Sequence, residues 1–313
     1  MPASALCGAV VDRPNQPMPK LLATLSLLAA LVVLVAGCGG GDETTGGGSE
    51  TAAGGGESTT ASAGEACPPG ELDTVSDGVL TVATDKPAYP PYFEDNDPSN
   101  GEGFESAVAY AIGEELGYPK AKVKWTVVPF DSSYAPGPKD FDFDVNQISI
   151  TPVREKAVDF SAPYYRANQA VVALDGSEAA QAKSLADLKD TKIGVQINTT
   201  SLSTVEEEIE PSSKPEVFNS SNDVVTALKN GQVEAVVVDL PTALYLTAAQ
   251  VEDATVVGQF GKASGEEWGA LLAKESPLTA CVSEAIESLE ASGELEKITQ
   301  RWMSQAADAP QLR

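Results

Sequence analysis

The chain has 313 residues and a formal net charge of −26, and 42% of its residues are apolar. That length allows one large or two medium domains with a buried core. The acidic balance argues against nucleic acid as a partner, because phosphates attract lysine and arginine. The absence of histidine excludes serine–histidine and cysteine–histidine nucleophile systems and histidine-ligated zinc. The sequence has no metal-ligand spacing, phosphate loop or nucleophile elbow, so we expect no catalytic residue, metal or cofactor.

The first 66 residues have the pattern of a targeting signal followed by a tether. Residues 1–37 are typical of a secretory signal peptide, with a good translation start at Met18. The ending Val-Ala-Gly-Cys matches the bacterial lipobox, so we expect Cys38 to be lipidated and the protein to lie on the outer face of the cell membrane. A membrane-spanning helix is the alternative, but the apolar run is short for one. Residues 38–66 are rich in Gly, Ser, Thr and Glu, which predicts a flexible tether.

Two cysteines follow the lipobox, Cys67 where the tether ends and Cys281 in a helical pattern near the C-terminus. Outside the cytoplasm an even pair favours a disulfide. Such a bridge would join the start of the folded part to the C-terminal helix. Two unpaired thiols are the alternative.

The folded part alternates predicted strands and helices. Apolar residues four apart, Val108, Ile112 and Leu116, predict an amphipathic helix that ends at Gly117. Strands precede and follow this helix, and a strand–helix–strand order implies a parallel sheet in an α/β protein. Strands are expected at 78–85, 121–130, 145–151, 168–174, 191–197, 233–239 and 268–275, and helices at 103–117, 184–190, 221–232, 241–249 and on both sides of Gly293 within 278–303.

Arg154 is the first candidate for a ligand-binding residue. Thr151 and the proline after it are typical of a helix start. Arg154 then lies in the first turn, where free backbone N–H groups already favour an anion. A guanidinium binds a carboxylate through two parallel hydrogen bonds, so we predict a carboxylate clamp of Arg154, the Ser149 hydroxyl and nearby N–H groups. The alternative is a surface arginine that pairs with Glu155 or Asp159.

Several motifs occur in the order known from one protein family. The segment SITPVREKAVDFSAPYY (149–165) resembles the signature of the bacterial extracellular solute-binding proteins of family 3, the amino-acid receptors of ABC importers. The likeness continues in LTVATDKPAYPPYFE, GEGFESAVAYAIGEELG, GVQINTTS and ALKNGQVEAVVVDLPTA, and it spans residues 78–303. It implies a two-lobed α/β fold of the periplasmic-binding-protein type II class. Each lobe would be a mostly parallel sheet flanked by helices, and two hinge strands would cross between the lobes.

The resemblance also implies the division of the chain and the position of the ligand. Lobe I would comprise residues 67–166 plus 268–313, and lobe II residues 167–267, with crossings near Ala167 and Glu267. The ligand, a free amino acid, would lie between the lobes.

The resemblance implies a role for each residue of the site. Arg154 would hold the ligand α-carboxylate, and Asp239, at the end of a predicted strand, would receive the α-ammonium. A helix cap is the alternative for Asp239, and ordinary packing is the alternative for the aromatic residues. The expected ligand-binding residues are Arg154, Asp239, Ser149, Thr199, Thr200, Gln147, Asn146, Tyr89, Phe130, Asp85 and Gln196.

The chain departs from the family pattern in four places. Asn146 and Gln147 replace small residues, and they either supply amides to the ligand or shrink the pocket. Asn198 replaces a glycine, and asparagine tolerates the positive φ of that turn. Asp144 falls in the middle of a strand of the family pattern, at a normally apolar position, where a buried carboxylate would need partners. The prolines within 136–138 forbid a regular helix there. These departures affect ligand identity more than the α-amino-acid clamp.

The leading hypothesis is a lipid-anchored, monomeric receptor that closes its lobes on a free, polar amino acid and delivers it to the permease of an ABC transporter. One alternative is an enzyme on the same scaffold, such as a dehydratase. Without histidine, only carboxylates, lysine or tyrosine could serve as its acid or base. The other alternative is a ligand-sensing receptor that signals through a separate protein.

Overall fold

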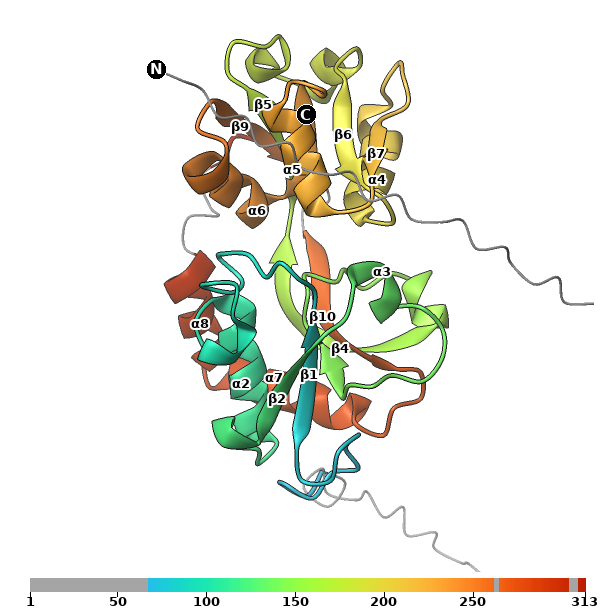
Figure 1. The fold of residues 1–313 in the computed structure, drawn as a ribbon, viewed down its shortest axis with the longest axis vertical. Helices are drawn as coiled ribbons and strands as arrows, with labels where there is room; N and C mark the ends of the chain where they lie inside the picture. Colours follow the sequence, from blue (N-terminus) through green and yellow to red (C-terminus); the bar gives the residue numbers. More distant parts are fainter. Residues whose placement is uncertain (1–66, 262–264, 304–308) are drawn as a thin grey trace, which may run out of the picture. The chain divides into compact units, whose positions relative to one another are not determined.

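The structure is a computed structural model that describes residues 67–261, 265–303 and 309–313. The predicted signal peptide, the predicted lipidation site Cys38 and the predicted tether lie outside the described residues. The described strands form two five-stranded sheets (Figure 1). We call the part built on the first sheet lobe I and the part built on the second sheet lobe II. Within the described ranges, no helix has the length and hydrophobicity needed to cross a membrane.

Lobe I contains a mixed sheet, and the first long helix and the last two helices of the chain cover one face of it. Their buried faces share one core with Trp268 and the strand residues Leu80 and Phe143. The strands, in sheet order, are β2 (Val123–Val127), β1 (Leu80–Thr84), β3 (Phe143–Asp144), β10 (Glu266–Ala273) and β4 (Val158–Ala167). The helices and helical turns are η1 (Pro98–Asn100), α2 (Phe104–Glu115), η2 (Lys120–Lys122), α3 (Phe130–Ser133), η3 (Arg154–Lys156), α7 (Thr279–Ala291) and α8 (Glu294–Met303).

Lobe II also contains a mixed five-stranded sheet, and helical segments cover both faces of it. Alternate residues of a central strand enter different cores: Val237 contributes to one and Val236 to the other. Such two-sided burial explains the unbroken apolar run that predicted this strand. The strands, in sheet order, are β7 (Glu216–Phe218), β6 (Ile193–Gln196), β8 (Ala235–Asp239), β5 (Gln169–Leu174) and β9 (Ala254–Phe260). The helical segments are η4 (Ala179–Gln181), η5 (Leu185–Leu188), α4 (Thr200–Thr204), η6 (Val205–Ile209), α5 (Ser221–Lys229), α6 (Leu240–Tyr245) and η7 (Leu246–Gln250).

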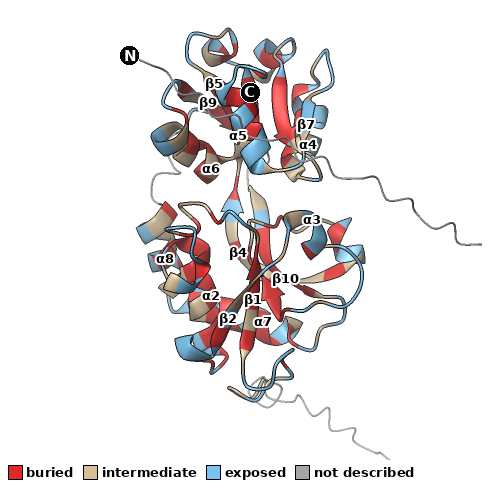
Figure 2. Ribbon diagram, in the orientation of Figure 1, coloured by how far each residue is buried: buried red, intermediate tan, exposed pale blue. Residues whose placement is uncertain are grey.

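The burial pattern follows the sequence periodicity. In α2, Val108 and Ile112 are fully buried, and Leu116, just after the helix, is 5% exposed. Figure 2 shows the same division, with buried residues along the strands and exposed residues on the outer helix surfaces. The last two helices are separated at Gly293, whose φ of 74° ends α7. The two-lobed α/β fold predicted from the sequence is therefore confirmed.

Each sheet is mixed, where a mostly parallel sheet was expected. Strands β1, β2 and β3 pair in parallel, but β10 is antiparallel to both β3 and β4. In lobe II, β5 is likewise antiparallel to β8 and β9. The antiparallel members are the strands next to the two crossings. A chain that leaves one sheet and later returns runs in opposite directions in its two crossing segments.

The crossings connect β4 to β5 at Asn168 and β9 to β10 between Phe260 and Glu266. Beside them, Arg166 of β4 pairs with Glu267 of β10 at 2.6 Å. The described C-terminal residues 309–313 contact lobe II, although the sequence assigned them to lobe I. The backbone N–H of Gln259 in β9 donates to the Pro310 carbonyl at 2.7 Å, and Leu312 is buried in a lobe II core.

The predicted strand at 145–151 is wrong. Strand β3 ends at Asp144, and the following segment forms no strand, although it makes an isolated bridge between Ser149 and Trp268. Gln147 has a φ of 49°, which is outside the extended region that a strand requires. The predicted strand at 121–130 ends at Val127, and Phe130 begins α3 instead.

Asp144 lies in β3 among apolar neighbours. It is fully buried and sits between Ala83 of β1 and Leu271 of β10 in the sheet. Neither carboxylate oxygen has a hydrogen-bond partner within the described part of the chain. Burial raises the pKa of the Asp144 carboxyl well above its usual range, and the charge of Glu105 adds to this, while Lys139 opposes it. The partners expected for this carboxylate are therefore missing from the described contacts.

The disulfide predicted between Cys67 and Cys281 is present and joins the start of the described chain to α7 across 214 residues. In the chain-entropy account, closing a loop of that length contributes about 5 kcal/mol. We expect the double variant Cys67→Ser, Cys281→Ser to have a lower free energy of unfolding in denaturant titrations. Reduction of the wild type should have the same effect. Equal unfolding midpoints with and without reductant would contradict this role.

The second prediction concerns Asp144→Asn. A folded-state pKa above the unfolded value means that ionisation of the folded protein costs free energy as the pH rises beyond the unfolded pKa. The neutral amide avoids this cost, so the variant should gain stability relative to wild type on going from pH 4 to pH 8. Thermal unfolding across that range measures the gain, with the exposed Asp140→Asn as control. A difference between variant and wild type that is the same at every pH would show that ionisation of Asp144 is not the cause.

Candidate ligand-binding site

A cavity of about 240 Å³ is lined by residues of both lobes. The carboxyl ends of β1 and β8 reach it, as expected for ligand sites in open α/β sheets. Every residue that the sequence predicted to bind the ligand lines this cavity: Asp85, Tyr89, Phe130, Asn146, Gln147, Ser149 and Arg154 from lobe I, and Gln196, Thr199, Thr200 and Asp239 from lobe II.

Arg154 is buried, with 8% of its surface exposed. Its Nη1 donates to the Ser149 carbonyl at 2.8 Å, and its Nη2 donates to the Asn198 carbonyl at 3.1 Å. The guanidinium also lies over the rings of Phe130 and Tyr134, at 5.4 and 5.0 Å from their centroids. Desolvation lowers the pKa of the guanidinium, but a group with so high a pKa stays charged. A guanidinium has five N–H donors, so some donors of Arg154 remain for a ligand that occupies the cavity.

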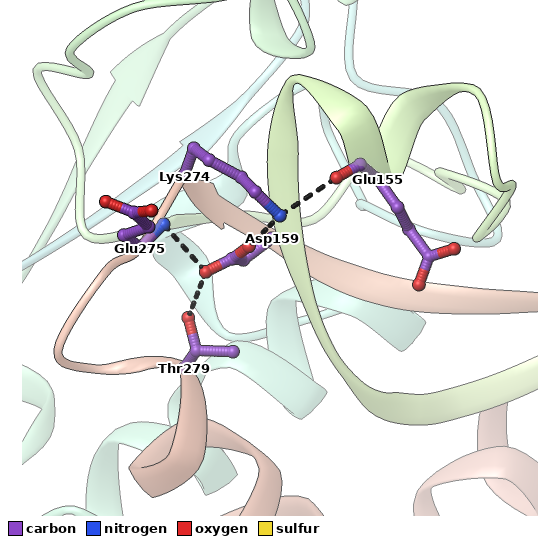
Figure 3. Close-up of polar contacts among 5 residues, drawn as sticks. All are labelled: Glu155, Asp159, Lys274, Glu275 and Thr279. Carbon is purple, nitrogen blue, oxygen red and sulfur yellow. Dashed lines mark hydrogen bonds and ion pairs between the residues drawn. The ribbon is translucent and has the colours of Figure 1, made fainter.

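The alternative of a surface arginine paired with Glu155 or Asp159 is wrong. Asp159 instead pairs with Lys274, whose Nζ lies 2.8 Å from its Oδ1 (Figure 3). Its other oxygen accepts from the backbone N–H of Glu275 at 2.9 Å and from the Thr279 hydroxyl at 3.3 Å. The same Lys274 donates to the backbone carbonyl of Glu155 at 2.9 Å. Arg154 makes no ion pair with any described residue, and its charge is directed into the cavity.

The helix predicted to begin near Arg154 is shorter than expected. The Thr151 hydroxyl accepts from the Arg154 backbone N–H at 3.2 Å, as a cap does. The helix is only the three-residue turn η3, which Arg154 begins. The position of the guanidinium is therefore set by the carbonyls that it contacts rather than by a long helix dipole.

Asp239 occupies the N-cap position of α6, but its side chain makes no cap hydrogen bond. Its Oδ1 instead accepts from Gln169 Nε2 at 2.7 Å. Desolvation is the largest cause that raises the pKa of this carboxyl to about 8, and the charge of Glu266 adds to it. The Gln169 hydrogen bond and the charge of Arg154 lower it. No side-chain hydrogen bond therefore supports the helix-cap alternative. A cation next to this carboxyl group would favour its ionised form.

A hydrogen-bond network at the crossings was missed by the sequence reasoning. The Ser149 hydroxyl donates to Glu266 Oε2 at 2.9 Å and lies 3.3 Å from the Thr200 hydroxyl. Gln169 Nε2 also reaches Glu266 Oε1 at 3.3 Å, and the Ser201 hydroxyl donates to Gln169 Oε1 at 2.6 Å. Glu266 begins β10 and Gln169 begins β5. The signal that could have found them is their position at the predicted crossings, where both lobes are within reach.

Glu105 organises a second network that was also missed. It is fully buried, and its Oε1 accepts from the Gln147 backbone N–H at 2.7 Å and from the Tyr164 hydroxyl at 2.5 Å. The Gln147 side-chain NH₂ donates to the other oxygen of the same carboxylate. Burial raises the pKa of Glu105 to about 7, although these hydrogen bonds lower it. Gln147 is held in its positive-φ conformation by this carboxylate, and its NH₂ group is already engaged.

The lobe II residues are oriented by local hydrogen bonds. The Thr199 hydroxyl accepts from the Leu202 backbone N–H at 3.2 Å and so caps α4. The Gln196 side-chain carbonyl accepts from the Ser221 hydroxyl at 2.6 Å. Asn198 between them has a φ of 61°, as expected for a residue that replaces glycine there. These bonds fix the turn against which Arg154 packs.

Direct contacts also connect the two lobes around the cavity. The Tyr89 hydroxyl donates to the Asn222 side-chain carbonyl, and the hydroxyls of Tyr92 and Thr242 lie 2.8 Å apart. Together with the contact between Arg154 and the Asn198 carbonyl, they define a state in which the lobes meet around the cavity. A two-lobed protein with a charged cavity between the lobes is the arrangement of a receptor that closes on a small ligand.

Comparison with known proteins identifies the family. The model for bacterial extracellular solute-binding proteins, family 3, matches residues 80–305, and this chain belongs to that family. The chain is similar to the arginine-binding extracellular protein ArtP of Bacillus subtilis (strain 168). The two are 30% identical over 217 residues, which are 68% of this chain and 82% of the relative.

Solved structures confirm the type II periplasmic-binding-protein fold. An ancestral arginine-binding protein bound to glutamine superimposes with a TM-score of 0.62 and is 32% identical, covering 73% of this chain and 99% of the other. The ancestral amino acid-binding protein AncCDT-1, a precursor of cyclohexadienyl dehydratase, has a TM-score of 0.58 and 30% identity, covering 72% and 94%.

Proposed function

We propose that this protein is an extracytoplasmic receptor that binds one free amino acid between its lobes and delivers it to the permease of an ABC importer. The observation that carries the proposal is the presence in one cavity of the guanidinium of Arg154 from lobe I and the carboxyl group of Asp239 from lobe II. A free amino acid carries the two complementary charges on adjacent atoms. The names of the relatives, which describe arginine-binding and amino acid-binding proteins, support the same class of ligand.

In this proposal the ligand α-carboxylate lies against the free N–H donors of Arg154, with the hydroxyl of Thr200 nearby. The α-ammonium lies against Asp239, next to the network of Ser149 and Glu266. Each lobe thus supplies one charged contact. A ligand that contacts both lobes binds the closed state more tightly than the open state, and this difference in affinity is what shifts the protein toward closure.

We further propose that the receptor works as a monomer that is anchored to the membrane through lipid on Cys38. The tether of 38–66 would allow the lobes to reach the permease while the anchor keeps the receptor close to it.

Catalysis on this scaffold is the competing function, since one structural neighbour is described as a precursor of a dehydratase. We propose binding rather than catalysis because the cavity pairs an arginine with an aspartate that match the two charges of a free amino acid. Product formed from a bound amino acid by catalytic amounts of the protein would overturn the proposal.

The first test is a thermal-shift screen of the common amino acids, followed by calorimetry with the best ligand. Ligands that bind the native state raise its unfolding temperature. Arg154→Ala should weaken binding about 30-fold or more, since losing one member of a desolvated charge pair costs about 2–5 kcal/mol. Arg154→Lys should also weaken binding, because an ammonium cannot form the two parallel hydrogen bonds.

The matched control is Arg301→Ala, which removes an exposed arginine from α8 and should leave the affinity unchanged. Unfolding temperatures without ligand check that each variant is folded. If Arg154→Ala binds as tightly as wild type, the clamp is assigned to the wrong residue. If no amino acid binds wild type, the receptor function itself is excluded.

The second test follows the proton on Asp239. Its pKa of about 8 with the lobes closed means that the ligand-free site in this state holds the proton at pH 7. An α-ammonium beside the carboxylate favours its ionised form, so binding at pH 7 should release about one proton and affinity should rise with pH up to about 8. Calorimetry in buffers of different ionisation enthalpy measures the released proton.

Asp239→Asn provides the control for this linkage, because an amide has no proton to lose. The neighbouring charged groups Glu266, Arg154 and Glu105 remain in that variant. Its binding should be weaker, and its binding enthalpy should no longer depend on the buffer. Proton release that persists in Asp239→Asn would assign the proton to another group.

A further inference from the structure

We propose that Asn146 and Asp85 form the side-chain end of the binding site and select amino acids whose side chain ends in a carboxamide. The inference rests on the function proposed above and names the class of amino acid that the site takes.

The two residues extend from neighbouring strands. Strands β1 and β3 are parallel, with Ala83 opposite Asp144, and the Val145 backbone N–H donates to the Ala83 carbonyl at 3.1 Å. If this register is continued by two residues, Asp85 lies opposite Asn146, on the same face of the sheet. Neighbouring strands are about 4.8 Å apart. Since both residues line the cavity, one ligand group is able to contact both.

Asn146 lines the cavity and carries a donor without a partner. Its Nδ2 is buried and has no acceptor among the described residues. A buried donor without an acceptor costs about 1–3 kcal/mol, so a ligand that supplies an acceptor recovers this free energy on binding. The neighbouring Gln147 does not compete for the ligand, because Glu105 already accepts from its NH₂ group.

Asp85 presents the complementary acceptor. Its Oδ1 accepts from the Lys86 backbone N–H at 2.6 Å, and its Oδ2 accepts from the Phe130 backbone N–H at 3.2 Å. These bonds orient the carboxylate, and a carboxylate has about four lone-pair sites. It can therefore accept further hydrogen bonds, but it cannot donate any when ionised.

A carboxamide is the side-chain group that matches this pair. Its carbonyl accepts from Asn146, and its NH₂ donates to Asp85. It also satisfies Asn146 if the asparagine amide turns over, because a carboxamide carries both a donor and an acceptor. A guanidinium or an ammonium carries only donors, so it leaves the Asn146 Nδ2 without an acceptor. A carboxylate carries only acceptors and is repelled by Asp85, although Lys86 at the cavity wall would partly offset this.

The test compares glutamine and asparagine with arginine, lysine and glutamate by calorimetry on the purified protein. At least one of the two carboxamide amino acids should bind 10-fold or more tightly than each of the three charged ones. Asn146→Ala should weaken binding of that ligand about 10-fold and reduce its advantage over the charged amino acids. The control Asn230→Ala removes an exposed asparagine after α5 and should change neither.

Asn146→Asp gives a result that a general loss of packing would not. It replaces the donor with a second acceptor beside Asp85, so preference should move from the carboxamide toward arginine or lysine. The inference is overturned if arginine, lysine or glutamate binds wild type more tightly than both carboxamides. It is also overturned if Asn146→Ala leaves their relative affinities unchanged. In either case binding that still requires Arg154 leaves the receptor function intact, whereas no binding by any amino acid removes both.

Discussion

The buried charge of Arg154 is the constraint on which the site depends. A guanidinium removed from water is costly unless its donors are satisfied, and here two of them reach backbone carbonyls, one in each lobe. Phe130 and Tyr134 cover its faces. No described carboxylate pairs with the guanidinium. Backbone carbonyls therefore hold it in place, and no negative charge of a described residue neutralises it. A ligand anion is the group that completes this arrangement.

Carboxyl groups surround this cation without forming an ion pair with it. Desolvation raises the pKa of Asp239 to about 8 and that of Glu105 to about 7, which keeps much of their charge off the empty protein near neutral pH. Glu266 and Gln169 connect Asp239 to Ser149 at the points where the chain crosses between the sheets. The residues proposed to hold the ligand charges are thus hydrogen-bonded to residues at the crossings.

Local patterns predicted the fold well where residues act through their own neighbourhood. The apolar spacing of Val108 and Ile112 located α2, and the cysteine count predicted the bridge from Cys67 to α7. The ligand-cavity residues were found through their order along the chain. The predicted strand after Asp144 failed because Gln147 takes a positive φ, and what holds it there is the carboxylate of Glu105, far away in sequence.

Partners that meet only in the folded state explain the other differences. The residues next to Arg154 in the sequence could not show whether it forms a clamp or a surface ion pair. The reason is that Asp159 pairs with Lys274, which is distant in the sequence. Glu266 and Gln169 carry no motif of their own and gain their place from the crossings. Asn146 and Gln147 also differ because of Glu105. Its carboxylate accepts a hydrogen bond from the Gln147 side chain, whereas the Asn146 Nδ2 has no acceptor among the described residues.

Changes to the ligand show whether opposite charges from the two lobes hold the two charged groups of one amino acid. The affinity of the best-binding amino acid should be compared with those of its N-acetyl derivative and its α-carboxyl methyl ester. Each derivative removes one charge and keeps the side chain. Each derivative should bind about 30-fold or more weakly than the parent. A derivative that binds as tightly as the parent would contradict the account, because the charge that it lacks would then have no partner in the site.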